Sequence, residues 1–247
     1  GAEGDKFGIS LAISGNTIVI GAPGRDDNGS FSGAAYVFVR NNNTWAQQAK
    51  LTSSRVTQDN IRFGSSVSIK GDTIVVGAPD NYHGSVSVFT RSGIIWAEST
   101  QLEPDDSAMG DGFGKSVALS GNNLLIGSRG TDGSGAVYLF SRENGSWTQI
   151  SKPVWDDNCY PRKDTDSAFG ASVALDGVNG LVGAPYHGCN LGTKRFGMAF
   201  AINGFEHDLG DKWYWIQSGD PLNASDSQID TKFGTSVALE NGVGIIG

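Results

Sequence analysis

Residues 7–21 read FGISLAISGNTIVIG, and this stretch decides the fold because the chain repeats its spacing five times. The Phe-Gly pairs begin at Phe7, Phe63, Phe113, Phe169 and Phe233. Each phenylalanine is followed by a serine three residues later and by a second glycine 14 residues later, these glycines being Gly21, Gly77, Gly127, Gly183 and Gly247. Repetition at a fixed spacing is typical of repeat architectures, in which one small unit is stacked many times.

Each copy contains two short β-forming runs around a polar turn. In the first copy, residues 11–13 and 18–20 are apolar and flank Ser14-Gly15-Asn16. The second and third copies follow the same plan at 67–69 with 74–76, and at 117–119 with 124–126. This pattern predicts a β-hairpin at the start of every repeat. A third strand is predicted at 33–38, 84–89, 135–140 and 197–200.

Tryptophan marks a fourth strand. Trp45 and Leu51 are six residues apart, and so are Trp96 and Leu102. Because side chains alternate along a strand, an even separation predicts that both members of each pair lie on one face. Trp147 and the Trp213/Trp215 pair occupy corresponding places, whereas Trp155 falls in an inserted loop.

Four antiparallel strands per repeat, with no helical periodicity, predict an all-β fold, a β-propeller of four-stranded antiparallel blades. The repeats start 56, 50, 56 and 64 residues apart, so their length differences fall in loops. We expect a single propeller segment over residues 1–247 with four complete blades and a fifth hairpin. The expected blades span 7–62, 63–112, 113–168 and 169–232, and the partial blade spans 233–247.

The glycine that closes each core opens a Gly-Ala-Pro run at 21–23, 77–79 and 183–185. With the Phe-Gly pairs, these runs resemble the FG-GAP repeat, the blade of the N-terminal β-propeller of integrin α-subunits. The third copy departs from the pattern with Gly127-Ser128-Arg129. The resemblance implies a seven-bladed ring, so we expect this chain to be an excerpt of a larger propeller, with further blades of the same parent chain as partners.

Composition excludes several classes of function. The 18 Lys and Arg residues are outnumbered by 26 Asp and Glu, which gives a formal charge of −8. Nucleic-acid binders need clustered basic side chains, so no nucleic-acid partner is expected. Apolar residues make up 38% of the chain, enough for a core, but no apolar run approaches the length that spans a bilayer. We therefore expect no membrane insertion by this segment.

The loops after strands two and four are longer than the turns after strands one and three. In an up-and-down blade these loops emerge on one face, and binding residues concentrate on loops held by a rigid scaffold. The motif phenylalanines and glycines are instead interpreted as structural, because every blade repeats them. The candidate ligand-binding residues on the loop face are Arg25, Asp26, Asp27, Asp80, Tyr82, His83, Arg129, Asp132, Tyr186 and His187.

A calcium site is not expected at the place where the resemblance implies one. Integrin blades carry an Asp-rich loop between strands one and two, but this chain has short turns there, such as Ser14-Gly15-Asn16. Such turns cannot supply the oxygen ligands that Ca²⁺ requires. No cofactor is therefore expected. A divalent ion on the acidic loops remains an alternative, although Asp is also common in solvated turns; the loop residues concerned are Asp26, Asp27, Asp105, Asp106, Asp111, Asp156 and Asp157.

Two further features favour an extracellular or cell-surface location. Cys159 and Cys189 lie in loops on the same side of one blade, and we expect them to form a disulfide. Glycosylation sequons begin at four loop residues, Asn28, Asn42, Asn144 and Asn223, which fits a glycoprotein.

No nucleophile elbow or phosphate-binding loop is present, and the chain has three histidines. The leading hypothesis is a non-catalytic recognition or adhesion module that binds a protein or glycan through the loop face. One alternative is a glycosidase or polysaccharide lyase in which Asp26 works with Asp132 or Asp111 as an acid/base pair. The other alternative is a structural spacer with no ligand of its own.

Overall fold

The structure is a computed structural model, and it describes residues 2–54, 59–80, 82–106, 109–130, 133–153, 167–187, 197–206, 213–225 and 231–247. These residues form strands, turns and loops, with no α-helix among them and hence no helix that could cross a membrane. The chain divides into two compact units, Gly1–Leu119 and Ser120–Gly247, which are described separately.

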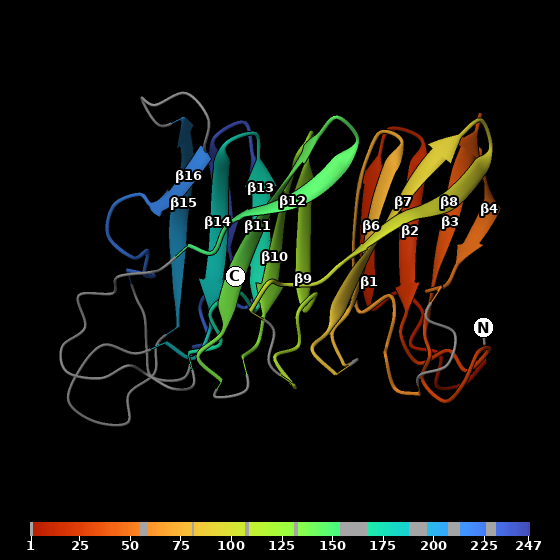
Figure 1. The fold of residues 1–247 in the computed structure, drawn as a ribbon, viewed down its shortest axis with the longest axis horizontal. Helices are drawn as coiled ribbons and strands as arrows, with labels where there is room; N and C mark the ends of the chain where they lie inside the picture. The colour runs from red at the N-terminus through yellow and green to blue at the C-terminus, as the bar shows by residue number, and fades with distance from the viewer. Residues whose placement is uncertain are drawn as a thin grey trace. The chain divides into compact units, whose positions relative to one another are not determined.

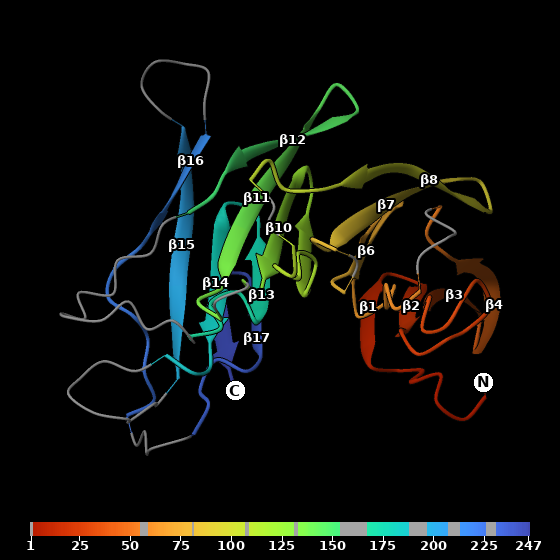
Figure 2. The same ribbon diagram turned by 60° about the horizontal axis from the view of Figure 1, so that its bottom comes forward.

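The first unit contains two four-stranded antiparallel sheets whose strands pair in chain order. The first sheet consists of β1 (Ser10–Ser14), β2 (Thr17–Ala22), β3 (Ala34–Asn41) and β4 (Thr44–Leu51). The second consists of β5 (Ser66–Lys70), β6 (Thr73–Ala78), β7 (Ser85–Ser92) and β8 (Ile95–Leu102). Figures 1 and 2 show β1 at one edge of the first sheet and β4 at the other edge, with β2 and β3 between them.

The second unit repeats this plan. Its first sheet begins with β9 (Ser116–Ser120), which crosses the boundary between the units, and continues with β10 (Asn123–Ser128), β11 (Ala136–Glu143) and β12 (Ser146–Ser151). The next sheet contains β13 (Ser172–Asp176), β14 (Asn179–Ala184), β15 (Met198–Glu206) and β16 (Trp213–Gln217). A hairpin of β17 (Val237–Glu240) and β18 (Val243–Ile246) follows. The predicted all-β fold of four-stranded antiparallel propeller blades is confirmed.

The core of the first unit lies between its two sheets. Every residue of β6 is buried. As the second strand of its sheet, β6 pairs with β5 on one side and β7 on the other, and other side chains cover its two faces. Val19 and Val37 of the first sheet pack with Phe63, Ile74 and other buried side chains of the second. Burial of such side chains supplies most of the stabilisation that holds adjacent blades together.

Within each unit, the repeated motif joins one repeat to the next. Phe63 is fully buried, and its ring lies 6.1 Å from that of Phe89 in an edge-to-face arrangement. The motif serine of the preceding repeat donates a hydrogen bond to the motif glycine: Ser10 Oγ lies 2.8 Å from the carbonyl oxygen of Gly64. The same bond occurs between Ser66 and Gly114 at 2.8 Å and between Ser172 and Gly234 at 2.9 Å. The motif phenylalanine and serine are therefore structural residues: the ring fills the space beneath the next sheet, and the hydroxyl bonds to the next motif glycine.

Glycine is required where the edges of two sheets meet. Gly33 precedes β3 and forms a parallel bridge with Phe63, with a φ of +77°. A Cβ atom at this position would overlap the backbone carbonyl and amide of Phe63. The left-handed conformation and the close approach of two backbones therefore both exclude a larger residue at position 33.

The fourth strands differ from the prediction by one bulged residue. Val37 pairs with Ala49, but Phe38 pairs with Gln47, so Gln48 is an extra residue in β4. The partners of Trp45 and Leu51 are Arg40 and Ala35, which are five residues apart and so on opposite faces. The prediction that Trp45 and Leu51 share a face was wrong, because it assumed an unbroken strand. Equivalent bulges at Ser99 in β8 and Ile150 in β12 show that the feature repeats.

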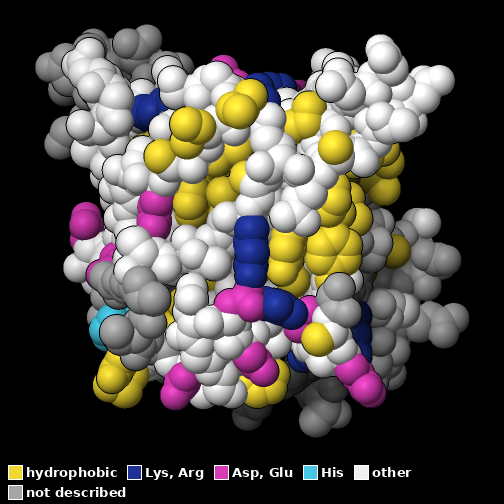
Figure 3. Space-filling view, turned by 90° about the vertical axis from the view of Figure 1, so that its right-hand side faces the viewer, with side chains coloured by type: hydrophobic (Ala, Val, Ile, Leu, Met, Phe, Trp, Pro, Cys, Tyr) yellow, Lys and Arg dark blue, Asp and Glu magenta, His cyan; other side chains and the backbone are white. Residues whose placement is uncertain are grey.

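The first sheet has one apolar face that no other described sheet of the first unit covers. Phe7 is 50% exposed and Leu11 is 69% exposed, whereas their counterparts in the second repeat, Phe63 and Val67, are 0% and 8% exposed. Figure 3 shows hydrophobic side chains gathered on this side of the molecule, beside a row of basic and acidic side chains. The difference follows from neighbours within the first unit, since its first sheet covers one face of its second sheet, and no described sheet of this unit covers the outer face of the first.

Candidate functional site

Tight turns and longer loops lie at opposite ends of each sheet. The turns after strands one and three contain two residues, 15–16 and 42–43 in the first sheet and 71–72 and 93–94 in the second. The loops after strands two and four are longer and include 23–33, 52–65, 79–84 and 103–115. Because neighbouring strands are antiparallel, all the turns of a sheet share one end and all its loops share the other. We call these the turn end and the loop end.

Side chains at the turn end are engaged in repeated structural contacts. Arg40, Arg91 and Arg142 lie over the rings of Trp45, Trp96 and Trp147, with the guanidinium carbon 5.8, 5.1 and 5.5 Å from the ring centres. Each arginine also donates to the Asn or Asp of the first turn, at 2.8 Å to Asn16, 2.7 Å to Asp72 and 3.1 Å to Asn122. In the fourth sheet Gly204 and Val178 keep the accompanying backbone bond but have no such side chains.

This arginine contact was missed from the sequence. Its signal is an arginine five residues before a tryptophan, which occurs at Arg40, Arg91 and Arg142. The turn end also links neighbouring repeats, since the backbone N–H of Gly71 donates to Ser14 Oγ at 3.1 Å and that of Gly177 donates to Ser120 Oγ at 2.9 Å. The turn end therefore serves the scaffold.

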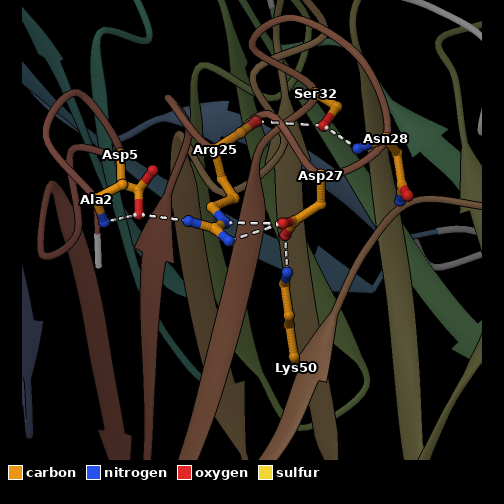
Figure 4. A network of polar contacts seen from close by, with 7 residues as sticks. All are labelled: Ala2, Asp5, Arg25, Asp27, Asn28, Ser32 and Lys50. Carbon is orange, nitrogen blue, oxygen red and sulfur yellow. Dashed lines mark hydrogen bonds and ion pairs between the residues drawn. The ribbon is translucent and has the colours of Figure 1, made fainter.

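At the loop end of the first sheet, four charged side chains form one network (Figure 4). The Arg25 guanidinium lies between two carboxylates, 3.0 Å from Asp5 Oδ2 and 2.8 Å from Asp27 Oδ1. Lys50, from β4, forms an ion pair with the other oxygen of Asp27. Two positive and two negative charges neutralise one another, so the network holds the loop in place.

Two pKa values in the network are displaced. The Ala2 backbone N–H donates to the Asp5 carboxylate at 2.6 Å and lowers the pKa of Asp5, and Arg25 adds to that effect. Burial lowers the pKa of Lys50, and the positive charge of Arg25 lowers it further. The shift at Asp5 reflects stabilisation of its charged form by its neighbours.

Among the predicted ligand-binding residues, Arg25, Asp26 and Asp27 are therefore used within the protein. Asp26 Oδ1 accepts a hydrogen bond of 2.6 Å from the backbone N–H of Phe31, which fixes the turn inside the 23–33 loop. Arg25 and Asp27 are occupied by the ion pairs of the network. The sequence placed them correctly in this loop but could not show that they bind one another.

Asp80 and Tyr82 lie in a second group that faces solvent. The Arg62 Nη1 atom is 3.0 Å from Asp80 Oδ2, and the two side chains are 47% and 39% exposed. The Arg62 guanidinium also lies 5.9 Å from the centre of the Phe31 ring. Tyr82, two residues after Asp80, is 60% exposed. We call Phe31, Arg62, Asp80 and Tyr82 the aromatic–charge row. Sequence reasoning missed Phe31 and Arg62, because the two residues are far apart in the sequence.

The two predicted histidines differ in burial. His83 is half-buried, and its carbonyl accepts a bond of 3.0 Å from the N–H of Phe113. His187 is fully buried, with its ring 5.8 Å from that of Phe200. Its carbonyl oxygen also accepts a 3.0 Å bond from the N–H of Gly197. The structure therefore packs His187 in the interior, against Phe200.

The remaining predicted residues are distributed as follows. Tyr186 is 39% exposed, and the Lys232 ammonium lies 5.7 Å from its ring centre. Arg129 is exposed in the loop after β10. Asp132 and both cysteines of the predicted disulfide, Cys159 and Cys189, lie outside the described residues.

The acidic loops were also weighed as metal or catalytic sites. In the part of the chain that the structure describes, no group of three or more His, Cys, Asp or Glu side chains is placed to hold a metal ion. For the alternative acid/base pair, Asp26 bonds to the backbone of its own loop, Asp111 lies in the loop after β8, and Asp132 lies outside the described residues. Asp156 and Asp157 also lie outside them.

Comparison with known proteins agrees with the repeat seen in the sheets. The FG-GAP repeat matches residues 1–38, 45–89 and 96–140, together more than half of the chain. No curated protein matches it. A crystal structure of TolB from Acinetobacter baumannii is similar at 11% identity and a TM-score of 0.45. That similarity covers 89% of this chain and 45% of TolB, so the chain spans less than half the length of that protein. By its family match and its repeated blades, the chain belongs to the FG-GAP repeat family.

Proposed function

We propose that this chain is a non-catalytic recognition module, extracellular or at the cell surface, which binds a protein or glycan partner through its loop end. The aromatic–charge row is the observation that carries this proposal. It presents an exposed tyrosine and an exposed ion pair on loops whose backbones are fixed by the Gly33–Phe63 and Gly84–Phe113 bridges. Aromatic and arginine side chains on a rigid support are typical of binding hot spots.

The contrast between the two ends of the first unit supports a loop-end site. At the turn end, arginines stack on tryptophans and bond to the first turns, and hydroxyls link neighbouring repeats. In the loop-end network, Arg25 and Lys50 neutralise Asp5 and Asp27. The aromatic–charge row differs because Tyr82, Arg62 and Asp80 are directed to solvent.

A second surface supports the further proposal that the first sheet packs against another blade of the same kind. Phe7 and Leu11 are exposed, although the same motif positions are buried in the second repeat. The chemistry of the observed interface between the first two sheets then defines the partner: small and β-branched side chains such as Val19, Ala35 and Val37.

A binding screen tests the loop-end proposal. The whole chain is applied to a glycan array and to a phage-displayed random peptide library, in Ca²⁺ and again in EDTA. Two matched double variants follow: Arg62→Ala with Tyr82→Ala at the loop end, and Ile94→Ala with Ile95→Ala at the turn end of the second sheet. All four side chains are exposed, so neither variant should unfold the protein.

We expect ligands found with the native chain to be lost by the loop-end variant and kept by the turn-end variant. Loss in the turn-end variant alone would contradict the proposal. Cleavage of arrayed glycans would instead favour the carbohydrate-active enzyme, and a chain with no ligand in either screen would favour the structural spacer.

A further inference from the structure

The residue before each Phe-Gly pair reaches back toward the loop of the preceding repeat. Its backbone has a left-handed φ in all five copies: Lys6 53°, Arg62 50°, Gly112 66°, Ala168 52° and Lys232 54°. At two of the three basic copies, the positive charge lies over an aromatic ring in the loop after strand two of the preceding sheet. Arg62 lies 5.9 Å from the Phe31 ring centre, and Lys232 lies 5.7 Å from that of Tyr186. The repeat therefore builds an internal cation–π pair at this place.

The other two junctions lack the basic residue. In the third sheet, the loop after strand two, 129–135, contains no aromatic residue, and Ala168 precedes the next Phe-Gly pair. In the second sheet, the loop after strand two contains Tyr82, and Gly112 precedes the next Phe-Gly pair. Among these four junctions, the one at Gly112 differs from the others. Its loop contains an aromatic residue, Tyr82, but the residue before its Phe-Gly pair is not basic.

The backbone register makes the second junction equivalent to the first. Phe63 and Phe113 form the same parallel bridge, with Gly33 and Gly84 respectively. The N–H of Phe63 donates to Ser32 at 3.2 Å, and that of Phe113 donates to His83 at 3.0 Å. One bond earlier the two junctions differ: the N–H of Arg62 donates to the Phe31 carbonyl at 3.0 Å, whereas the Tyr82 carbonyl accepts from the N–H of Gly110. Tyr82 and Phe31 therefore share the position before the bridge, with different backbone partners.

Tyr82 also occupies a conformation that disfavours a large side chain. Its φ is +38°, and the corresponding residue of the third sheet is Gly133, with a φ of +77°. Bulky residues are rare in the left-handed region, and such strain is concentrated at functional sites. The equivalent Phe31 has a φ of +52° and is 38% exposed with Arg62 beside its ring, whereas Tyr82 is 60% exposed.

The charges around Tyr82 favour a cation. The loop of residues 103–112 contains four carboxylates, Glu103, Asp105, Asp106 and Asp111, and no lysine or arginine. This loop contacts Tyr82 directly, because the Gly110 N–H donates to the Tyr82 carbonyl. Asp80 lies two residues before Tyr82, and the basic group beside it, Arg62, is already paired with it. The negative face of the Tyr82 ring and the acidic composition of this loop therefore suit a positive group.

We infer that Tyr82 is the contact point for a lysine or arginine side chain of a protein partner, which completes the cation–π pair that Gly112 leaves incomplete. This inference rests on the proposed function, because it identifies the chemistry of a partner at the loop end. The partner's cation stands where Arg62 stands in the first junction, over an aromatic ring and next to carboxylates.

The test introduces a basic side chain at position 112 of the protein itself. Peptides are selected from the random phage library on the native chain, and their affinities are measured by fluorescence polarisation for the native chain and two variants. Gly112→Lys introduces the side chain that Lys6 and Lys232 carry at the same φ, whereas Gly112→Ala is the matched control, because Ala168 occupies the same place in its own repeat. A second pair, Tyr82→Phe and Tyr82→Leu, keeps or removes the aromatic ring.

We expect the selected peptides to be enriched in lysine or arginine. Their affinity should fall about threefold to thirtyfold with Gly112→Lys and with Tyr82→Leu, the range of an exposed to partly desolvated cation–π pair. It should be retained with Gly112→Ala and Tyr82→Phe. Equal loss with Gly112→Lys and Gly112→Ala would overturn the inference, because charge would then not be the cause.

Two other results separate this inference from the proposed function. Peptides that need Arg62 and Tyr82 but contain no basic residue would overturn the inference and leave the loop-end site standing. Ligands that are insensitive to every loop-end substitution would contradict both.

Discussion

Replacing Phe63 with alanine should destabilise the protein far more than the same change at Phe7, although both occupy the first position of the motif. Phe63 is fully buried between the first two sheets, whereas Phe7 is 50% exposed on the uncovered face of the first sheet. An aromatic side chain presents about 200 Å² of surface, so complete burial at about 25 cal/mol per Å² corresponds to roughly 5 kcal/mol.

Part of that energy is retained by the alanine methyl group, and the cavity left behind adds a further penalty. For Phe63→Ala we therefore expect a loss of about 3 to 5 kcal/mol in the free energy of unfolding. For Phe7→Ala about half of the ring is already in water and no closed cavity forms, so the expected loss is about 1 to 2 kcal/mol. The edge-to-face contact of Phe7 with Tyr36, at 5.5 Å between ring centres, is included in that range.

The assay is urea unfolding of the whole chain, followed by tryptophan fluorescence, to which Trp45 and Trp96 contribute from the first two sheets. Measurements at two protein concentrations separate folding from association through the uncovered face. Equal losses for the two variants, independent of concentration, would refute the claim that neighbouring sheets determine the role of the motif phenylalanine.

Three further predictions concern single contacts. Gly33→Ala should destabilise the first unit by more than about 2 kcal/mol, because the added Cβ would overlap the Phe63 backbone and the φ of residue 33 is left-handed. Gly15 is also left-handed but has no atom nearby, so Gly15→Ala should cost only about 1 to 2 kcal/mol. Urea unfolding midpoints measure both variants, and equal losses would contradict the steric argument. Ser66→Ala removes a buried bond to the Gly114 carbonyl and should lower the free energy of unfolding by about 1 to 2 kcal/mol. The control is Ser65→Ala at the half-buried neighbour, whose bond to the Arg62 carbonyl is exposed to solvent, and an unchanged value for Ser66→Ala would show that the Gly114 carbonyl finds another donor. The lowered pKa of Asp5 means that its charged form favours the folded state, so its stabilisation is present above about pH 4 and is lost as the pH falls through the folded pKa. Between pH 6 and about pH 3, the thermal unfolding midpoint should therefore fall less steeply for Asp5→Asn than for the native chain. Parallel curves for the two proteins would argue against this assignment.

Much of the fold could be predicted from the sequence because its signals are local and repeated. The run FGISLAISGNTIVIG contains the two strands and the turn of the first hairpin, and the structure places β1 and β2 there. The four-stranded meander followed from the third and fourth runs of each copy. The fourth strands were predicted in the right places but with the wrong facing, because one bulged residue such as Gln48 leaves no trace in the spacing of Trp45 and Leu51.

The site could be predicted only as far as its loops. Arg25 and Asp27 were correctly assigned to the loop end, but their network also includes Asp5 and Lys50, which lie far from them in the sequence. Likewise, Arg62 meets Phe31 and Asp80 only because adjacent repeats stack in one register. Which charges remain available to a partner is thus a property of tertiary packing, which local sequence patterns do not contain.

Hydrogen exchange with a selected ligand bound is the measurement that tests the central claim most directly. The account predicts that the ligand slows amide exchange in residues 24–33, 59–62 and 82–84 at the loop end of the first unit. Exchange at the turn-end residues 42–43 and 93–94 should stay unchanged. Protection confined to the turn-end residues, with the loop-end amides unaffected, would contradict the assignment of recognition to the loop end.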